Sequence, residues 1–160
     1  MTDCIPKEIT PEAREKRSKA RTKRILGQCG SARFISTDRH FSRKVRGELK
    51  RDYGYKVEEV FEYDETGMAY IPHAQVDINM IVKNDKIVFL EIRQEASEAD
   101  VYTLAKKAEL YEKKHNKKPS ALLIMSIILS PKGKLFLEHY GISHFSFTSK
   151  LGDALCKILE

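Results

Sequence analysis

The chain has 160 residues, of which 41% are hydrophobic and 32% charged, with a formal net charge of +6. This composition is that of one globular domain large enough to bury its own core. Three widely spaced cysteines without a CxxC pair argue against a disulfide framework or a thiolate zinc site. The longest apolar run, residues 121–129, is too short to cross a bilayer, and the N-terminus lacks a signal-peptide pattern. We therefore expect a cytoplasmic protein.

Basic charge is concentrated at the start of the chain. Residues 1–51 carry 15 Lys and Arg against 6 Asp and Glu, a net charge of +9, whereas residues 52–160 sum to −3. Arg93 is the only arginine in the second part. Such a region is typical of a polyanion binder; a solubilising surface or an interaction tail is the alternative.

Two helices are expected in this basic region. Thr10-Pro11-Glu12 has the pattern of a helix start, and this helix would run to about Leu26. It has few apolar residues, so we expect residues 1–36 to form a basic N-terminal arm and residues 37–160 to form a single α/β domain. The second helix is expected over Asp38–Tyr53 and ends before Gly54.

The second helix has two distinct faces. Phe41, Val45 and Leu49 recur at helical spacing and predict its buried stripe. Four basic side chains fall on the opposite face and are the candidate nucleic-acid-binding residues: Arg39, Arg43, Arg46 and Lys50. Glu48 projects toward the buried side, where a carboxylate is costly unless it is paired.

Strands and helices then follow one another. The expected strands are Tyr55–Tyr63, Ala74–Val82, Lys86–Arg93, Ala121–Leu129 and Ile142–Phe147, with helices at Ser97–Lys114, Pro131–Tyr140 and Ser149–Leu159. Residues 83–85 indicate a hairpin, and the helix after residue 96 predicts a parallel pairing between 86–93 and 121–129. This order predicts an α/β fold with a mixed sheet flanked by helices.

Asp77 and Glu91 stand out as candidate site residues. They lie on the two strands of the predicted hairpin, each among Val, Ile and Phe, and this placement brings two carboxylates together at a sheet edge. Their repulsion is relieved by a shared cation, and oxygen ligands suit Mg²⁺ or Mn²⁺. A structural ion pair with Arg93 is the alternative interpretation.

The same residues carry a family resemblance. Gly54-Tyr55, Val76-Asp77-Ile78 and the run from Ile87 to Arg93 resemble the core of the PD-(D/E)XK nuclease superfamily, with Glu91-Ile92-Arg93 as the (D/E)-x-K element. The downstream residues Leu104, Glu109-Leu110-Tyr111, Lys118-Pro119, Leu122-Leu123-Ile124 and Gly141-Ile142 are similar to an uncharacterised archaeal and bacterial branch. Archaeal Holliday-junction resolvases are more distantly similar. The resemblance covers roughly residues 38–147.

The resemblance implies a restriction-endonuclease-like αβββαβ core and an Mg²⁺-dependent (or Mn²⁺-dependent) endonuclease acting on nucleic acid, DNA in preference to RNA. Asp77 and Glu91 would be the metal ligands, with the Ile92 carbonyl as a third, and Glu48 and Arg93 would complete the catalytic set. A homodimeric assembly is also compatible with the resemblance.

Arg93 departs from the family pattern, which has lysine at this position. Arginine cannot lose its proton to act as a base, but it can clamp a phosphate. Two further hypotheses therefore stand beside a nuclease. One is a catalytically inactive nucleic-acid-binding member of the same fold, and the other is a module that docks an acidic protein partner.

Overall fold

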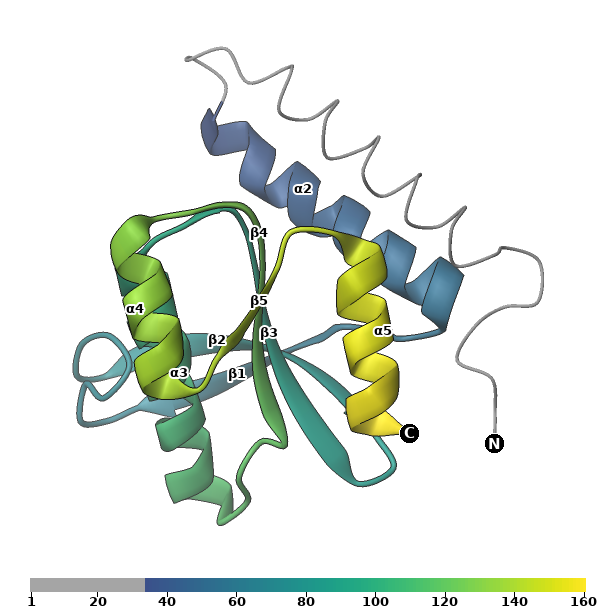
Figure 1. The fold of residues 1–160 in the computed structure, drawn as a ribbon. Helices are drawn as coiled ribbons and strands as arrows, with labels where there is room; N and C mark the ends of the chain where they lie inside the picture. The colour runs from purple at the N-terminus through teal and green to yellow at the C-terminus, as the bar shows by residue number, and fades with distance from the viewer. Residues whose placement is uncertain (1–33) are drawn as a thin grey trace.

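A five-stranded mixed sheet forms the centre of the computed structural model, which describes residues 34–160 (Figure 1). The strands are β1 (Glu58–Asp64), β2 (Ala74–Lys83), β3 (Lys86–Ala96), β4 (Ala121–Leu129) and β5 (Ser143–Phe145), in this spatial order. β1, β2 and β3 pair antiparallel, and β4 and β5 add in parallel. The mixed sheet and the parallel β3–β4 pairing confirm the predicted fold.

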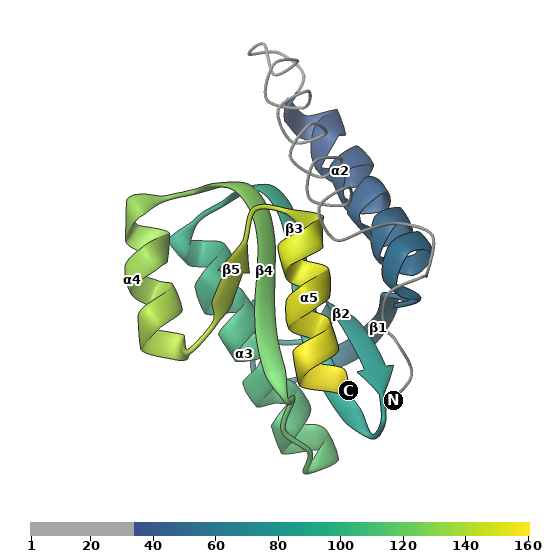
Figure 2. The ribbon, with the colours of Figure 1, turned by 45° about the vertical axis from the view of Figure 1, so that its right-hand side comes forward.

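The helices cover the sheet in two layers (Figure 2). Helices α3 (Glu98–His115) and α4 (Pro131–Tyr140) pack on one face, and α2 (Phe34–Glu48) and α5 (Thr148–Leu159) pack on the other. The order α2-β1-β2-β3-α3-β4 is the predicted αβββαβ core. The predicted helix at residues 10–26 and nearly all of the predicted arm lie outside the described residues, and no helix of the described part is long and apolar enough to span a membrane.

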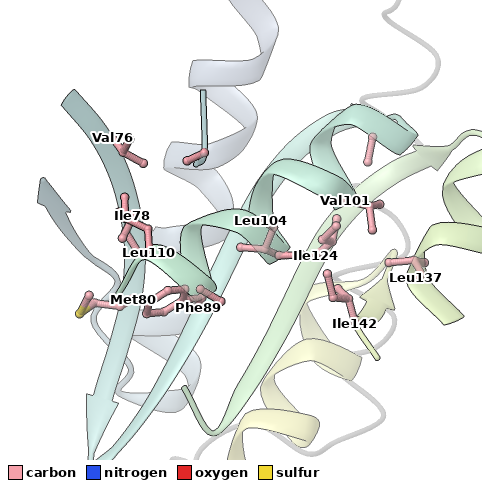
Figure 3. Close-up of a cluster of buried hydrophobic side chains, with 14 of the residues drawn as sticks. Val76, Ile78, Met80, Phe89, Val101, Leu104, Leu110, Ile124, Leu137 and Ile142 are labelled. Carbon is pink, nitrogen blue, oxygen red and sulfur yellow. The ribbon is translucent and has the colours of Figure 1, made fainter. Parts of the chain in front are cut away.

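Each face of the sheet has its own hydrophobic core. Between the sheet and α3, the buried side chains include Val76, Ile78 and Met80 of β2, packed with Phe89 and Leu104 (Figure 3). The odd-numbered positions of β2 and the even-numbered positions of β3 face α2 and α5 instead, as the two-residue period of a strand requires. Both faces of the central strands are therefore apolar, which explains the nearly continuous apolar run in β4.

The helical segment of α2 ends where predicted, but its last turn is not α-helical. The chain is already helical at Phe34, the first described residue and four positions before the predicted start, and the last turn, Leu49–Tyr53, is π-helical. Gly54 then ends the helix in the left-handed conformation at φ +75°, as predicted. The π turn brings the Tyr53 ring against α5, where a Cβ on Gly152 would come within 2.2 Å of a ring atom. A glycine at position 152 is what allows this close packing.

The turn between β1 and β2 is organised around one buried carboxylate. Asp64 accepts hydrogen bonds from the backbone N–H groups of Gly67, Met68 and Ala69 at 2.8–3.0 Å. Burial raises the pKa of the Asp64 carboxyl, but these backbone donors lower it by more, so its pKa lies below the ordinary value. The carboxylate fixes the loop that carries Tyr70 to the edge of the candidate site.

Candidate functional site

Asp77 and Glu91 meet at a fork between β2 and β3. The register of the hairpin runs from Lys83 opposite Lys86 to Met80 opposite Phe89 and stops there. Beyond that point the strands diverge (Figure 3). A continued pairing would point Asp77 and Glu91 to opposite faces of the sheet. The fork instead lets both carboxylates reach the same group.

That shared group is the ammonium of Lys107 on α3. Lys107 Nζ lies 3.6 Å from Asp77 Oδ2 and 3.4 Å from Glu91 Oε2. The side chain of Lys107 is only 2% exposed and that of Glu91 10%, whereas that of Asp77 is 43% exposed. Burial lowers the pKa of Lys107, but the charges of Glu91 and Asp77 raise it by more, and the pKa lies above its ordinary value. Lys107 is therefore a charged ammonium at neutral pH.

Sequence reasoning missed Lys107. The inner face of α3 is apolar and includes Val101, Leu104 and Ala108, all of which are buried. Lys107 follows Leu104 by three positions and falls on that same buried face. A lysine on an apolar stripe is the signal that could have found it, just as a glutamate on an apolar stripe drew attention to Glu48.

Arg93 connects three carboxylates. Its Nε lies 3.1 Å from Glu91 Oε1 and 3.5 Å from Asp100 Oδ1, and its Nη1 lies 3.7 Å from Asp38 Oδ2. Asp38 also accepts the backbone N–H of Gln94 at 2.8 Å, which ties the start of α2 to β3. Burial lowers the pKa of the guanidinium, whereas the charges of Glu91, Asp100 and Asp38 raise it, so the pKa is higher than usual.

The predicted site residues are brought together only in part. A cleft of about 620 Å³ has Asp77, Glu91 and Arg93 among its lining residues, and α2 lines it with Asp38, Arg39, Ser42, Arg43 and Arg46. Arg46 is held in place by Asn79 on β2, at 2.6 Å. Glu48 is buried, 6% exposed, and neither it nor Lys50 is among the lining residues. The catalytic role of Glu48 and the binding role of Lys50 stay predictions.

Lys50 lies beyond the part of α2 that lines the cleft, within the π-helical turn Leu49–Tyr53. The basic residues of α2 that line the cleft are Arg39, Arg43 and Arg46, which we call the arginine row. Arg93 of β3 lines the same cleft.

The αβββαβ order, with a carboxylate pair at the fork of the second and third strands, defines a restriction-endonuclease-like protein. Residues 74–137, which hold both carboxylates and Lys107, match a family model described as the PD-(D/E)XK nuclease superfamily. The match covers less than half of the chain and supports the superfamily resemblance that its sequence motifs carry.

Solved structures similar to this chain include three that cover much of it. They are EndoMS in its apo form (16% identity, 67% of this chain and 44% of that one, TM-score 0.48), a repair endonuclease from Pyrococcus abyssi (21%, 72% and 46%, 0.40), and Can2 from Sulfobacillus thermosulfidooxidans in complex with cyclic tetra-adenylate (11%, 75% and 36%, 0.47). The chain spans less than half the length of each. No curated protein sequence matches it.

Proposed function

We propose that this protein is an Mg²⁺-dependent endonuclease that hydrolyses phosphodiester bonds in DNA. The observation that carries the proposal is the convergence of Asp77 and Glu91, from two strands, in a cleft that is also lined by arginines. Carboxylates held together are unfavourable unless cations compensate them, and proteins keep such pairs for metal or proton chemistry. The arginine row supplies positive charge for a phosphate backbone beside the pair.

The donor set fits a small hard cation. Asp77 and Glu91 would hold Mg²⁺, and the family resemblance adds the Ile92 carbonyl. The described residues contain no cluster of three or more His, Cys, Asp or Glu suited to an ion, but Mg²⁺ is commonly bound by one or two carboxylates with water in the remaining positions. When bound, it supplies Lewis-acid activation of water and neutralises charge that develops on a phosphodiester.

Carboxylates outnumber cations in the ion pairs at the fork. Four carboxylates, Asp38, Asp77, Glu91 and Asp100, contact two cations, Arg93 and Lys107. A divalent cation would compensate this excess, together with the three arginines of α2 that line the same cleft.

Lys107 and Arg93 hold positive charge next to the reacting phosphate. Neither takes a proton at neutral pH, because the pKa of Lys107 is raised and a guanidinium remains protonated in proteins. Fixed positive charges aimed at developing negative charge lower a barrier without needing to reorganise. We assign to Lys107 the charge that the family places on the motif lysine, and to the half-exposed Arg93 the orientation of a phosphate.

The test is cleavage by the purified protein. With Mg²⁺ the parent should cut DNA, and with EDTA it should not. Asp77→Asn and Glu91→Gln remove one charge each at nearly constant size, so both should lose cleavage while DNA binding in EDTA persists. Glu109→Gln, which changes an exposed carboxylate paired with Lys106 on the outer side of α3, is the matched control and should cut normally.

A second function is favoured by one observation. Both carboxylates already contact a cation, Glu91 contacts two, and a site neutralised in this way needs no metal. The protein would then be a nucleic-acid-binding member of the fold that does not cut. In that case Mg²⁺ should not raise the Tm of the parent but should raise that of Arg93→Ala, in which a cation has been removed.

A further inference from the structure

Exposed aromatic side chains gather near the carboxylates, on strand β1 and in the loop that follows it. The described residues expose eight large hydrophobic side chains, and four of these lie between positions 61 and 71. Three of the four are aromatic, and we call them the aromatic strip: Phe61 (55% exposed), Tyr63 (48%) and Tyr70 (44%). Single exposed apolar residues are ordinary, but a cluster beside a cleft marks a binding surface.

The strand register places Phe61 beside the site. Phe61 on β1 pairs directly with Asp77 on β2, and Tyr63 pairs with Gln75. Paired residues of an antiparallel sheet project to the same face with their Cβ atoms about 4.5–5.5 Å apart. The residue directly opposite Phe61 is therefore a carboxylate, and the Phe61 side chain remains more than half exposed.

The face that carries these rings is the cleft face. Glu59, two residues before Phe61 on β1, lines the cleft. The alternate residue Glu62 points to the other face, where it contacts Lys114 and His115 of α3. By the two-residue period, Phe61 and Tyr63 lie on the side of Glu59 and continue the floor of the cleft outward.

Tyr70 borders the same site from the β1–β2 loop. The Lys107 Nζ atom lies 5.6 Å from the centroid of its ring. This is within the range of a cation–π contact, so the ring lies next to the ammonium that joins the two carboxylates. Tyr70 therefore brings the aromatic strip to the ammonium that the two carboxylates share.

From this arrangement, and resting on the proposed function, we infer that the substrate is DNA with unpaired bases beside the scissile phosphate. Phosphates would follow the arginine row, and bases freed from pairing would stack on the aromatic strip. In a duplex the bases are stacked on one another inside the helix, and their faces are not available to protein rings. Aromatic rings beside a basic groove are the usual means of holding single-stranded nucleic acid.

Charge on β1 argues for bases rather than for phosphates or a second protein copy. The strand carries Glu58, Glu59, Glu62 and Asp64 and no basic residue. A phosphate backbone would be repelled along it, and edge-to-edge pairing of two β1 strands would bring like charges together. Uncharged bases avoid both penalties.

The experiment compares two strands that differ only in their bases. Fluorescence anisotropy in EDTA measures binding of a single-stranded DNA oligonucleotide and of an abasic strand of the same length, which keeps every phosphate. The parent should bind the base-bearing strand more tightly. Phe61→Ala and Tyr63→Ala should each weaken binding of that strand by on the order of tenfold and leave the abasic strand unaffected. Phe61→Tyr keeps the ring and should retain the preference.

Leu135→Ala is the matched control, because Leu135 is a comparably exposed apolar residue on α4, far along the chain from the strip. It should change neither affinity. Equal binding of both strands by the parent would overturn the inference, as would a loss in Phe61→Ala that is the same for the abasic strand. A change in oligomeric state of Phe61→Ala without a change in base preference would reassign the strip to self-association and overturn it too.

The two proposals fail in different ways. If the parent prefers the base-bearing strand but cuts no DNA with Mg²⁺, the result contradicts the proposed nuclease activity but not the proposed binding of bases by the aromatic strip. If the parent cuts DNA but binds both strands equally, the result contradicts only the proposed binding of bases by the aromatic strip.

Discussion

Replacing Lys107 by methionine should expose how much the carboxylate pair depends on this ammonium. Methionine fills similar space without the charge, so Glu91, nearly buried, loses one of its two cations. Removing one partner of a buried ion pair costs about 3–5 kcal/mol. Arg93 remains 3.1 Å from Glu91 and Asp77 is partly solvated. We therefore expect a smaller loss of about 2–3 kcal/mol, or a Tm lower by about 4–12 °C.

Thermal unfolding in EDTA and in Mg²⁺ measures this loss. Mg²⁺ should stabilise Lys107→Met more than the parent, because the ion then meets two carboxylates without a competing ammonium. The difference in Tm between the parent and Lys107→Met in EDTA should stay constant from about pH 6 to 9, since the raised pKa keeps Lys107 charged until the pH rises through that value. Cleavage should fall by about 100-fold or more, the usual cost of losing one fixed donor at a reacting centre.

Two variants separate charge from packing. Lys106→Met removes the neighbouring lysine, which pairs with Glu109 at the surface, and should change Tm little. The double variant Lys107→Met with Glu91→Gln removes both charges and should recover part of the lost stability. A Lys107→Met protein as stable and as active as the parent would refute the assignment of Lys107 to the site.

Three further expectations concern other parts of the site. Arg93→Lys should retain or increase cleavage, because it keeps the charge, whereas Arg93→Ala should remove most of it; equal activity of the two in a DNA cleavage assay would contradict this. Glutamine in the arginine row should make DNA binding less salt-dependent, lowering the log–log slope by about 0.7–0.9 per lost phosphate contact, and an unchanged slope would move the contact surface elsewhere. Asp64→Asn should destabilise the fold by about 1.5–3 kcal/mol at neutral pH. Because the folded pKa of Asp64 is lowered, this difference should shrink as the pH falls below about 3.9, and a constant difference down to low pH would show that the carboxylate charge is not responsible.

Periodicity made most of the fold predictable from sequence. Three local patterns each indicate one kind of element. They are the apolar alternation of β2 and β3, the Asn84-Asp85 turn and the continuous apolar run of β4. Asn84 and Asp85 both take positive φ, as a two-residue hairpin turn requires. The Ser97–Asp100 capping box likewise fixed the start of α3. Each of these signals depends only on residues that are close together in the sequence, so it can be recognised without knowing the tertiary structure.

The site was less predictable because it depends on departures from regular structure. Strand parity places Asp77 and Glu91 on opposite faces, and only the fork between β2 and β3, which no local pattern announces, brings them together. Lys50 falls in a π-helical turn, which the helical period of the sequence does not predict. Lys107 could have been found, because it lies on the buried face of its own helix. The fork is the feature that depends on long-range geometry.

The most direct test of the central claim is DNA cleavage by the purified protein with Mg²⁺, set against its Glu91→Gln variant. The parent should cut DNA that contains unpaired nucleotides, EDTA should stop it, and Glu91→Gln should not cut although it still binds. Cleavage that persists in Glu91→Gln, or no cleavage of any duplex, single strand or junction by the parent, would contradict the account.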